Sequence, residues 1–204
     1  MKNSSYRKPR PLNRKIEHVR DTSLIIIATE GEKTEPLYFD MDCFKRKKIQ
    51  IRIISTEEGT SSPKDVLDRL HKEATEYQFM EGDQFWLVID KDRWTDDMLR
   101  EIIGLCNDSN YQVALSNPCF ELWLLLHFRK VEELDLPENM SSNDIKGVFN
   151  PLINERNAGD YDATYTPWIS QALTEAPKLD THPDAPFPDC PGTRVYRLVE
   201  ELMR

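Results

Sequence analysis

The stretch Phe85-Trp86-Leu87-Val88-Ile89-Asp90-Lys91-Asp92-Arg93 changes abruptly from apolar to charged residues. Its continuous apolar run predicts a strand that is buried on both faces of a parallel sheet. Ligands of open α/β sheets bind at the carboxyl ends of strands, which is where Asp90 and Asp92 fall. Two carboxylates about 4 Å apart repel by roughly 4 kcal/mol at a surface-like dielectric, and a hard cation such as Mg²⁺ or Mn²⁺ would relieve that repulsion. The alternative is a turn followed by a helix cap, since Asp is common in both.

A second apolar strand, residues 23–29, runs into Glu30-Gly31-Glu32-Lys33-Thr34-Glu35-Pro36. Gly31 permits a tight turn, and Thr34 and Pro36 suit the start of a helix whose core face would carry Leu37, Met41 and Phe44. A nucleotide-binding loop at this place would be rich in glycine, whereas this loop has three acids. The loop therefore favours a cation site over a nucleotide site. Alternatively, Glu32 and Glu35 only complement the helix dipole.

Two further strands complete the predicted sheet, one of alternating polarity at residues 49–54 and one at residues 111–115. Helices are predicted between the strands, one opening at Ser62 and Pro63 and one capped by Thr95. This β-α-β-α-β-α-β order predicts the α/β class, with a mostly parallel four-stranded sheet flanked by helices.

The fourth strand is followed by Ser116-Asn117-Pro118-Cys119-Phe120-Glu121-Leu122-Trp123-Leu124-Leu125-Leu126-His127-Phe128. We expect Asn117 to cap, and Pro118 to open, a helix that is apolar on nearly every side and therefore buried. Glu121 in such a helix needs a partner, either a metal ion with its water or a Lys or Arg side chain. We expect His127 to be a hydrogen-bonded core histidine.

Charge and composition divide the chain into three parts. Residues 1–20 hold seven basic residues against Glu17 alone, while the whole chain has a net charge of −9, so residues 21–204 are strongly acidic. We interpret 1–20 as a basic flexible arm that binds phosphates or serves as a solvated tail or a strap over the acidic body, 21–130 as the α/β domain, which the resemblance described below implies to be catalytic, and 131–204 as a helical extension packed on the same domain. The arm's candidate nucleic-acid contacts are Arg7, Lys8, Arg10, Arg14 and Lys15.

Compartment is indicated by three features. No segment approaches the roughly 20 apolar residues of a membrane helix, and the charged N-terminus does not fit a secretory signal. The four cysteines are scattered without a CxxC pair, which favours reduced thiols over zinc ligands or disulfides. We expect a cytoplasmic protein, and a homo-oligomer is left open.

A strand that ends in Glu-Gly and a later strand that ends in Asp-x-Asp resemble the Toprim catalytic domain of topoisomerases, primases and OLD-family nucleases. More specifically, residues 29–35, 89–92, 116–123 and 191–195 resemble the RloB-like family, and Ser-Asn-Pro-x-Phe-Glu-Leu-Trp is the most distinctive run. The resemblance implies a Toprim-like, Mg²⁺- or Mn²⁺-dependent nuclease of DNA or RNA that acts in prokaryotic antiphage defence. It also implies an ABC/OLD-type ATPase encoded nearby as a partner.

The resemblance further implies roles for single residues. Glu30, Asp90 and Asp92 would hold the metal or move protons, and Glu32 competes for the role of Glu30. Glu35 and Glu121 are candidate ligands of a second metal. The predicted nucleic-acid contacts beside these acids are Lys33, Lys91, Arg93 and Asn117.

Two other functions remain open at the level of sequence. Asp-x-Asp after a strand can hold a metal–diphosphate in a nucleotidyl or glycosyl transferase, although the acids around Glu30 would repel a diphosphate. A non-catalytic, Mg-binding receiver-like module would use Asp90 as phosphoacceptor and Ser116 after the fourth strand. That module needs a fifth strand ending in lysine, which the sequence does not offer, and it does not explain Asp92 or Glu121.

Overall fold

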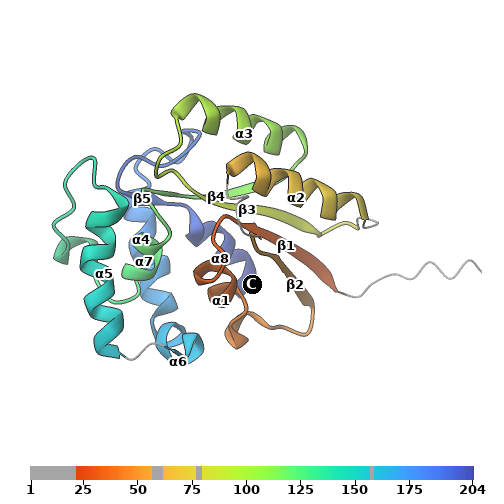
Figure 1. The fold of residues 1–204 in the computed structure, drawn as a ribbon. Coiled ribbons are helices and arrows are strands. Elements are labelled where there is room, and N and C mark those ends of the chain that lie inside the picture. The colour runs from red at the N-terminus through yellow and green to blue at the C-terminus, as the bar shows by residue number, and fades with distance from the viewer. Residues whose placement is uncertain (1–21, 57–61, 77–79, 157–158) are drawn as a thin grey trace, which may run out of the picture.

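The computed structural model describes residues 22–56, 62–76, 80–156 and 159–204, so the basic arm at residues 1–20 lies outside the described residues. Its centre is one sheet in the order β2-β1-β3-β4-β5 (Figure 1). The strands β1 (Ser23–Thr29), β2 (Ile49–Ile54), β3 (Gln84–Asp90) and β4 (Gln112–Asn117) are parallel. The expected mostly parallel α/β sheet is confirmed, with one correction to its strand count. The two-residue strand β5 (Gly192–Thr193) joins antiparallel to β4 and makes five strands.

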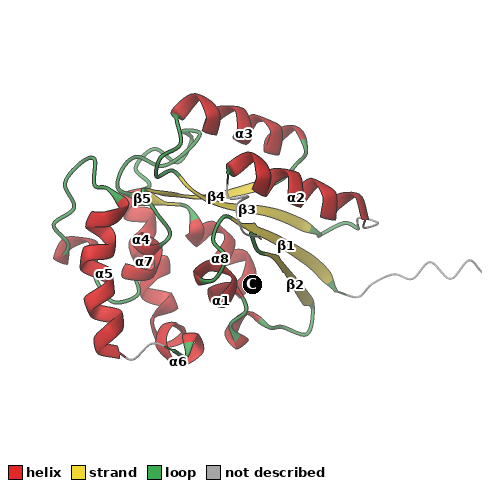
Figure 2. Cartoon of the chain, in the orientation of Figure 1, coloured by secondary structure: helices red, strands yellow, loops and turns green. Residues whose placement is uncertain are grey.

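Alternating side chains of the central strands supply both faces of the sheet. Leu24 and Ile26 of β1 pack on one face, against α2 (Pro63–Glu76) and α3 (Asp96–Asp108). Ile25 and Ile27 pack on the other face, in the larger core. That core is covered by α1 (Thr34–Phe39), α4 (Glu121–Leu125), α7 (Ile169–Leu179) and α8 (Val195–Met203). Figure 2 shows the resulting helix–sheet–helix layering. Burial on both faces explains the continuous apolar runs.

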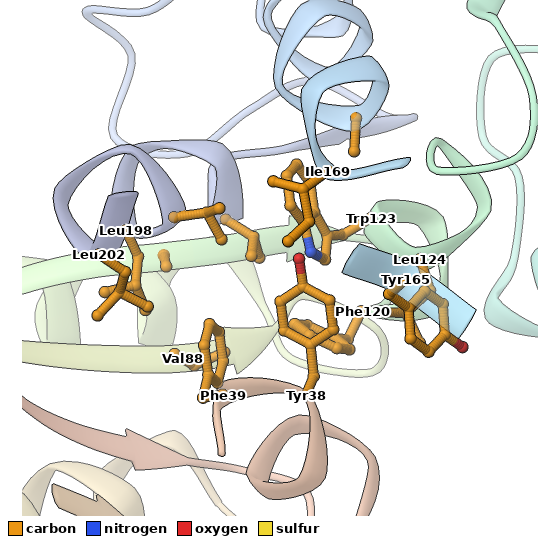
Figure 3. Packing of buried hydrophobic residues seen from close by; sticks show 14 of the residues in the cluster. Tyr38, Phe39, Val88, Phe120, Trp123, Leu124, Tyr165, Ile169, Leu198 and Leu202 are labelled. Atoms are coloured by element: carbon orange, nitrogen blue, oxygen red, sulfur yellow. The ribbon is translucent and has the colours of Figure 1, made fainter. Parts of the chain in front are cut away.

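The larger core contains a buried polar contact that the sequence pattern did not reveal. The Tyr38 hydroxyl lies 3.1 Å from His127 Nε2 and points toward Trp123, as Figure 3 shows. The backbone oxygen of Trp123 lies 3.1 Å from His127 Nδ1. Burial lowers the pKa of His127 to about 3, so the ring is neutral. Its Nδ1–H donates to the Trp123 oxygen, and its Nε2 accepts a hydrogen bond from the Tyr38 hydroxyl. The expected hydrogen-bonded core histidine is confirmed.

The first helix differs from its prediction. Thr34 is its first residue and not its cap, and the helix ends at Phe39. Leu37, which was expected on the core face, is 51% exposed. Met41 and Phe44 are buried as expected, but Met41 caps η1 (Asp42–Phe44) and Phe44 is its last residue. The helical spacing of Leu37, Met41 and Phe44 predicted one helix, whereas the structure has two short elements, α1 and η1.

The segment after β4 also differs. Asn117 is the last residue of β4, and its side-chain Nδ2 donates to the Pro188 oxygen, so the expected helix cap is wrong. The Asn117–Pro118 peptide bond is cis, and α4 begins only at Glu121. Burial of the apolar run is confirmed from Leu122 through Phe128.

The C-terminal third is mostly helical and contributes to the central sheet through β5. It contains η2 (Val131–Glu133), α5 (Ser142–Arg156), α6 (Tyr161–Tyr165) and η3 (Thr166–Trp168) before α7. Residues 161–179 do not form one continuous helix, because η3 separates α6 from α7. Thr193 lies in β5, where its hydroxyl is 2.9 Å from that of Ser116. None of the described helices is both long enough and apolar enough to cross a bilayer.

Candidate functional site

A pocket of about 470 Å³ opens where β1 and β3 end side by side. It also receives side chains from α1, α4 and α5. Five carboxylates and two lysines line it, so negative charge is in excess. We call it the acid pocket, and its charged residues are Glu30, Glu32, Glu35, Asp90, Glu121, Lys33 and Lys146.

Glu30 is held in place by both of its carboxylate oxygens. Its Oε2 accepts from the backbone N–H of Asp90 at 3.0 Å, and its Oε1 accepts from the Trp94 indole N–H at 3.1 Å. Burial raises the pKa of Glu30, although the two hydrogen bonds and the nearby Arg93 oppose the shift. Glu32, the competing candidate, is exposed at the rim of the acid pocket. The arrangement therefore places Glu30, and not Glu32, at the junction of the two strands.

Glu35 folds back over the turn that carries Gly31. Its Oε1 accepts from the Gly31 backbone N–H at 3.1 Å. A Cβ at position 31 would lie 1.9 Å from Glu35 Oε2, so any other residue there would force the Glu35 carboxylate to move away. Glu35 is 7% exposed, and burial raises its pKa to about 7, with repulsion from Glu121 and Glu30 adding to the shift. A buried carboxyl that titrates near neutrality is consequently built into this turn.

Asp90 stands among the other acids at the end of β3. Burial raises its pKa well above the ordinary range, and repulsion from Glu35, Glu30 and Glu121 raises it further. A hydrogen bond from the Phe120 backbone opposes this. Carboxylates on different elements thus disfavour ionisation at one another, as expected where like charges share a site.

Glu121 has the salt bridge that was one of its two expected partners. Lys146 Nζ of α5 lies 3.5 Å from Glu121 Oε1. Lys146 was not predicted from the sequence, because α5 lies beyond the predicted catalytic domain and only long-range packing on α4 brings it here. The one sequence signal for Lys146 was that a glutamate in an apolar helix, Glu121, needs a positively charged partner.

Asp92 does not line the acid pocket. It is exposed on the turn after β3, with a left-handed φ of 27°, and its Oδ1 accepts from the Ser142 hydroxyl at 2.9 Å. Its backbone N–H donates to the Pro118 oxygen. The negative charge of Asp92 still acts on the acid pocket, because it contributes to the raised pKa of Glu30.

The predicted nucleic-acid contacts are not gathered at one place. Lys33 is exposed at the rim of the acid pocket, and Arg93 stacks on the Trp94 ring. Lys91 Nζ is paired with Asp96 at 2.7 Å and faces a different cavity, beside Phe187. Asn117 is buried, with its amide hydrogen-bonded to the 180–191 loop. The five candidates of the arm lie outside the described residues.

A family model described as RloB-like protein matches residues 25–202, which is most of the chain. The chain belongs to the RloB-like family. Searches of curated proteins and of solved structures gave no match. The match spans both the acid pocket and β5, so it includes every described element that shapes the site.

The acid pocket of this RloB-like chain suits a hard cation in donor type and in charge. Its acidic donors are carboxylate oxygens, which Mg²⁺ prefers, and a cation would neutralise the repulsion that, together with burial, raises the pKa values of Asp90 and Glu35. Among the described residues, however, no three His, Cys, Asp or Glu side chains already converge as a ready-made ligand set. Both oxygens of Glu30 are also engaged in hydrogen bonds. Cation binding would require carboxylates such as Asp90 and Glu35 to turn toward a common point.

The raised pKa of Glu35 predicts how stability depends on pH in the absence of metal. Its pKa is about 7 in the folded state and about 4.5 ordinarily, so the folded chain binds more protons between these values. Stability should therefore fall as pH rises from about 5 to about 8, by up to about 3 kcal/mol from this group. Glu35→Gln should remove that part of the slope in urea unfolding with EDTA present. Glu32→Gln, at the exposed rim, is the matched control and should leave the slope unchanged. A wild-type slope in Glu35→Gln would contradict the assignment.

Proposed function

We propose that the chain is a divalent-cation-dependent nuclease that hydrolyses phosphodiester bonds of DNA or RNA at the acid pocket. The observation that carries the proposal is the set of acids gathered in one open pocket, where burial and repulsion from neighbouring acids raise the pKa values of Glu30, Glu35 and Asp90. Such a set is costly to the fold without a cation, and perturbed carboxylates in a cleft favour a functional site. Membership of the RloB-like family agrees with the proposal but does not name an activity.

The residues that would hold the cation are Asp90 and Glu30, with Glu121 as a further ligand. When bound, a divalent cation polarises a phosphoryl oxygen and neutralises the charge that develops on it. The Glu30 carboxylate would be a fixed ligand, because its two hydrogen bonds hold it against the end of β3 and the Trp94 indole. Asp92 would act from the adjacent turn, where Ser142 holds its Oδ1.

Proton transfer is the role that the structure favours for Glu35. A carboxyl with a pKa of about 7 is populated in both protonation states at neutral pH, which is suited to a general base or acid. Its Oε1 is occupied by the Gly31 N–H, so Oε2 is the oxygen left to take a proton from an attacking water.

Lys146 supplies the positive charge that a phosphate needs in an acidic pocket. Its Nζ is 3.5 Å from Glu121 Oε1, a long contact that leaves the ammonium able to turn toward a phosphoryl oxygen. Lys33 at the rim would add a second contact to the phosphate backbone.

The receiver-like alternative gains no support from the fold. The fifth strand is antiparallel and is followed by Arg194, whose guanidinium is bound to Asp180. It therefore brings no lysine to the acid pocket. No observation in the described part of the chain favours the transferase.

The proposed activity is tested by incubating the protein with end-labelled single- and double-stranded DNA and RNA in Mg²⁺ or Mn²⁺. We expect cleavage that EDTA abolishes and that Lys146→Ala reduces, while Lys64→Ala, an exposed lysine on α2, leaves it unchanged. No cleavage of any of these substrates, with or without the ATPase partner proposed below, would overturn the proposal.

The family resemblance, taken alone, supports three wider proposals. The protein would act in the cytoplasm, as an effector of prokaryotic antiphage defence, together with an ABC/OLD-type ATPase. Co-purification of the tagged chain with the product of a neighbouring ATPase gene tests the partner, and protection from phage that depends on Asp90 tests the role.

A further inference from the structure

An apolar groove of about 640 Å³ lies between α1 and β2. Its floor is formed by Ile49, Ile51 and Ile53, which are only partly buried, and Leu37 of α1, 51% exposed, forms part of its wall. The three isoleucines lie on one face of β2 and extend along about 13 Å of strand, at about 3.3 Å per residue. Apolar surface left open in this way marks an interaction site.

The groove is continuous with the acid pocket. Glu32 and Lys33 line both cavities. Because β1 and β2 are parallel, their carboxyl ends meet at one edge of the sheet, and Ser55 after β2 lines the end of the groove that joins the acid pocket. A chain-like ligand that crosses the acid pocket can therefore continue into the groove.

The charge of the groove is opposite to that of the acid pocket. Its described lining residues include three basic and two acidic side chains, whereas the acid pocket has five carboxylates and two lysines. A polyanionic chain would be repelled by the acid pocket without its cation and attracted by the groove.

The two ends of the groove each carry a basic side chain that is available to a ligand. Lys33 stands at the junction with the acid pocket, and Arg46 stands at the far end. The Arg46 backbone is fixed there, because its oxygen accepts from the Ile49 N–H at 3.3 Å. Lys45 is paired with Asp40 and Asp42, but neither Lys33 nor Arg46 has an ion pair within the described ranges.

An apolar floor between two basic ends matches unpaired nucleotides. The faces of exposed bases would pack on the isoleucines and on Leu37, and the flanking phosphates would meet Lys33 and Arg46. A duplex keeps its bases inside the helix, so it would gain only the phosphate contacts. A peptide segment would also suit the apolar floor, but it would not explain the opening into the acid pocket.

We propose that this groove binds an unpaired segment of the nucleic acid beside the point of cleavage, so that the substrate is single-stranded DNA or RNA, or a single-stranded part of either. The inference rests on the proposed function, because it takes the acid pocket as the place where the strand is cut. Its test measures binding separately from cleavage, so the two can fail independently.

The first measurement is fluorescence anisotropy of a labelled 12-nucleotide single strand and of the duplex of the same sequence, in EDTA and at low salt. The wild type should bind the single strand at least about tenfold more tightly than the duplex. Leu37→Asn should weaken single-strand binding at least about fivefold, because it removes an apolar contact with a base without adding charge. Leu105→Asn on α3, a leucine that is 43% exposed, is the matched control and should bind like the wild type.

The salt dependence of single-strand binding gives the second readout. Each phosphate contact contributes about 0.7 to the slope of log K against log salt for single strands, so Lys33→Ala/Arg46→Ala should reduce the slope by about 1.4. Lys64→Ala/Lys72→Ala removes the same charge from exposed positions of α2 and should leave the slope unchanged.

Three results would overturn the inference. They are duplex binding by the wild type that equals or exceeds single-strand binding, wild-type affinity in Leu37→Asn, and an unchanged salt slope in Lys33→Ala/Arg46→Ala. If Leu37→Asn binds the strand normally and loses only its co-purification with the proposed ATPase, the groove binds a protein segment and the inference is wrong. Cleavage together with wild-type affinity in Leu37→Asn would overturn the groove alone, whereas strand binding that depends on Leu37, without cleavage in any cation, would overturn the nuclease proposal alone.

Discussion

Asp90→Ala is expected to lower phosphodiester cleavage by at least about 100-fold, the scale on which one preorganised electrostatic group acts in catalysis. Asp90 is the acid that the other three crowd, and its backbone N–H is also what fixes Glu30. Because the substitution keeps that N–H, Glu30 should stay in position while the cation loses its central ligand. Glu30→Ala should lose activity to a similar degree.

The folded state should tolerate the Asp90 substitution. Removing one carboxylate from a crowded pocket removes repulsion, so the melting temperature in EDTA should stay equal or rise. Asp97→Ala, an exposed acid in the first turn of α3, is the matched control and should keep full activity. Full activity in the double variant Asp90→Ala/Asp92→Ala would exclude the acid pocket as the catalytic site.

Asp180→Asn is expected to lower the free energy of unfolding by about 3–5 kcal/mol, the usual cost of breaking a buried ion pair. Asp180 and Arg194 are each 5% exposed. The Arg194 guanidinium donates to both carboxylate oxygens of Asp180, and Arg197 and Tyr196 donate to its Oδ2. Without the carboxylate, a buried guanidinium would keep its charge and lose its counter-ion.

The effect of Asp180 should extend to the sheet edge. Arg194 also donates to the backbone oxygens of Ala185, Pro186 and His182, so it holds the loop that precedes β5. Chemical denaturation measures the loss, with Asp184→Asn on the exposed part of the same loop as control. A loss below about 1 kcal/mol would show that the hydrogen bonds and not the charge pair stabilise this region.

The strands and the acids at their ends were predictable because burial on both faces leaves a clear sequence pattern. β1 and β3 carry unbroken apolar runs, and each run stops at a carboxylate that the structure places in the acid pocket. Glu121 was also predictable, because a carboxylate in a helix that is otherwise apolar needs a partner, and the structure supplies Lys146.

The remaining features depend on contacts between segments far apart in sequence. β5 has two residues and no periodicity, so only its pairing with β4 defines it. The core position of Tyr38 could not be read from the sequence, because the group that accepts a hydrogen bond from its hydroxyl, His127, lies far along the chain. Lys146 reaches the acid pocket because α5 packs on α4, and Asn117 was misassigned because its amide is held by Pro188, which is 71 residues later.

The most direct test of the central claim, that the acid pocket holds a divalent cation, is calorimetric titration of the metal-free protein with Mn²⁺. We predict saturable binding that releases protons near pH 7, visible as a heat that varies with the ionisation enthalpy of the buffer, because Glu35, whose pKa burial raises to about 7, is partly protonated there. Asp90→Asn/Glu30→Gln should abolish this binding, whereas Asp96→Asn/Asp97→Asn should retain it. Absence of binding to the wild type, or unchanged affinity in Asp90→Asn/Glu30→Gln, would contradict the account.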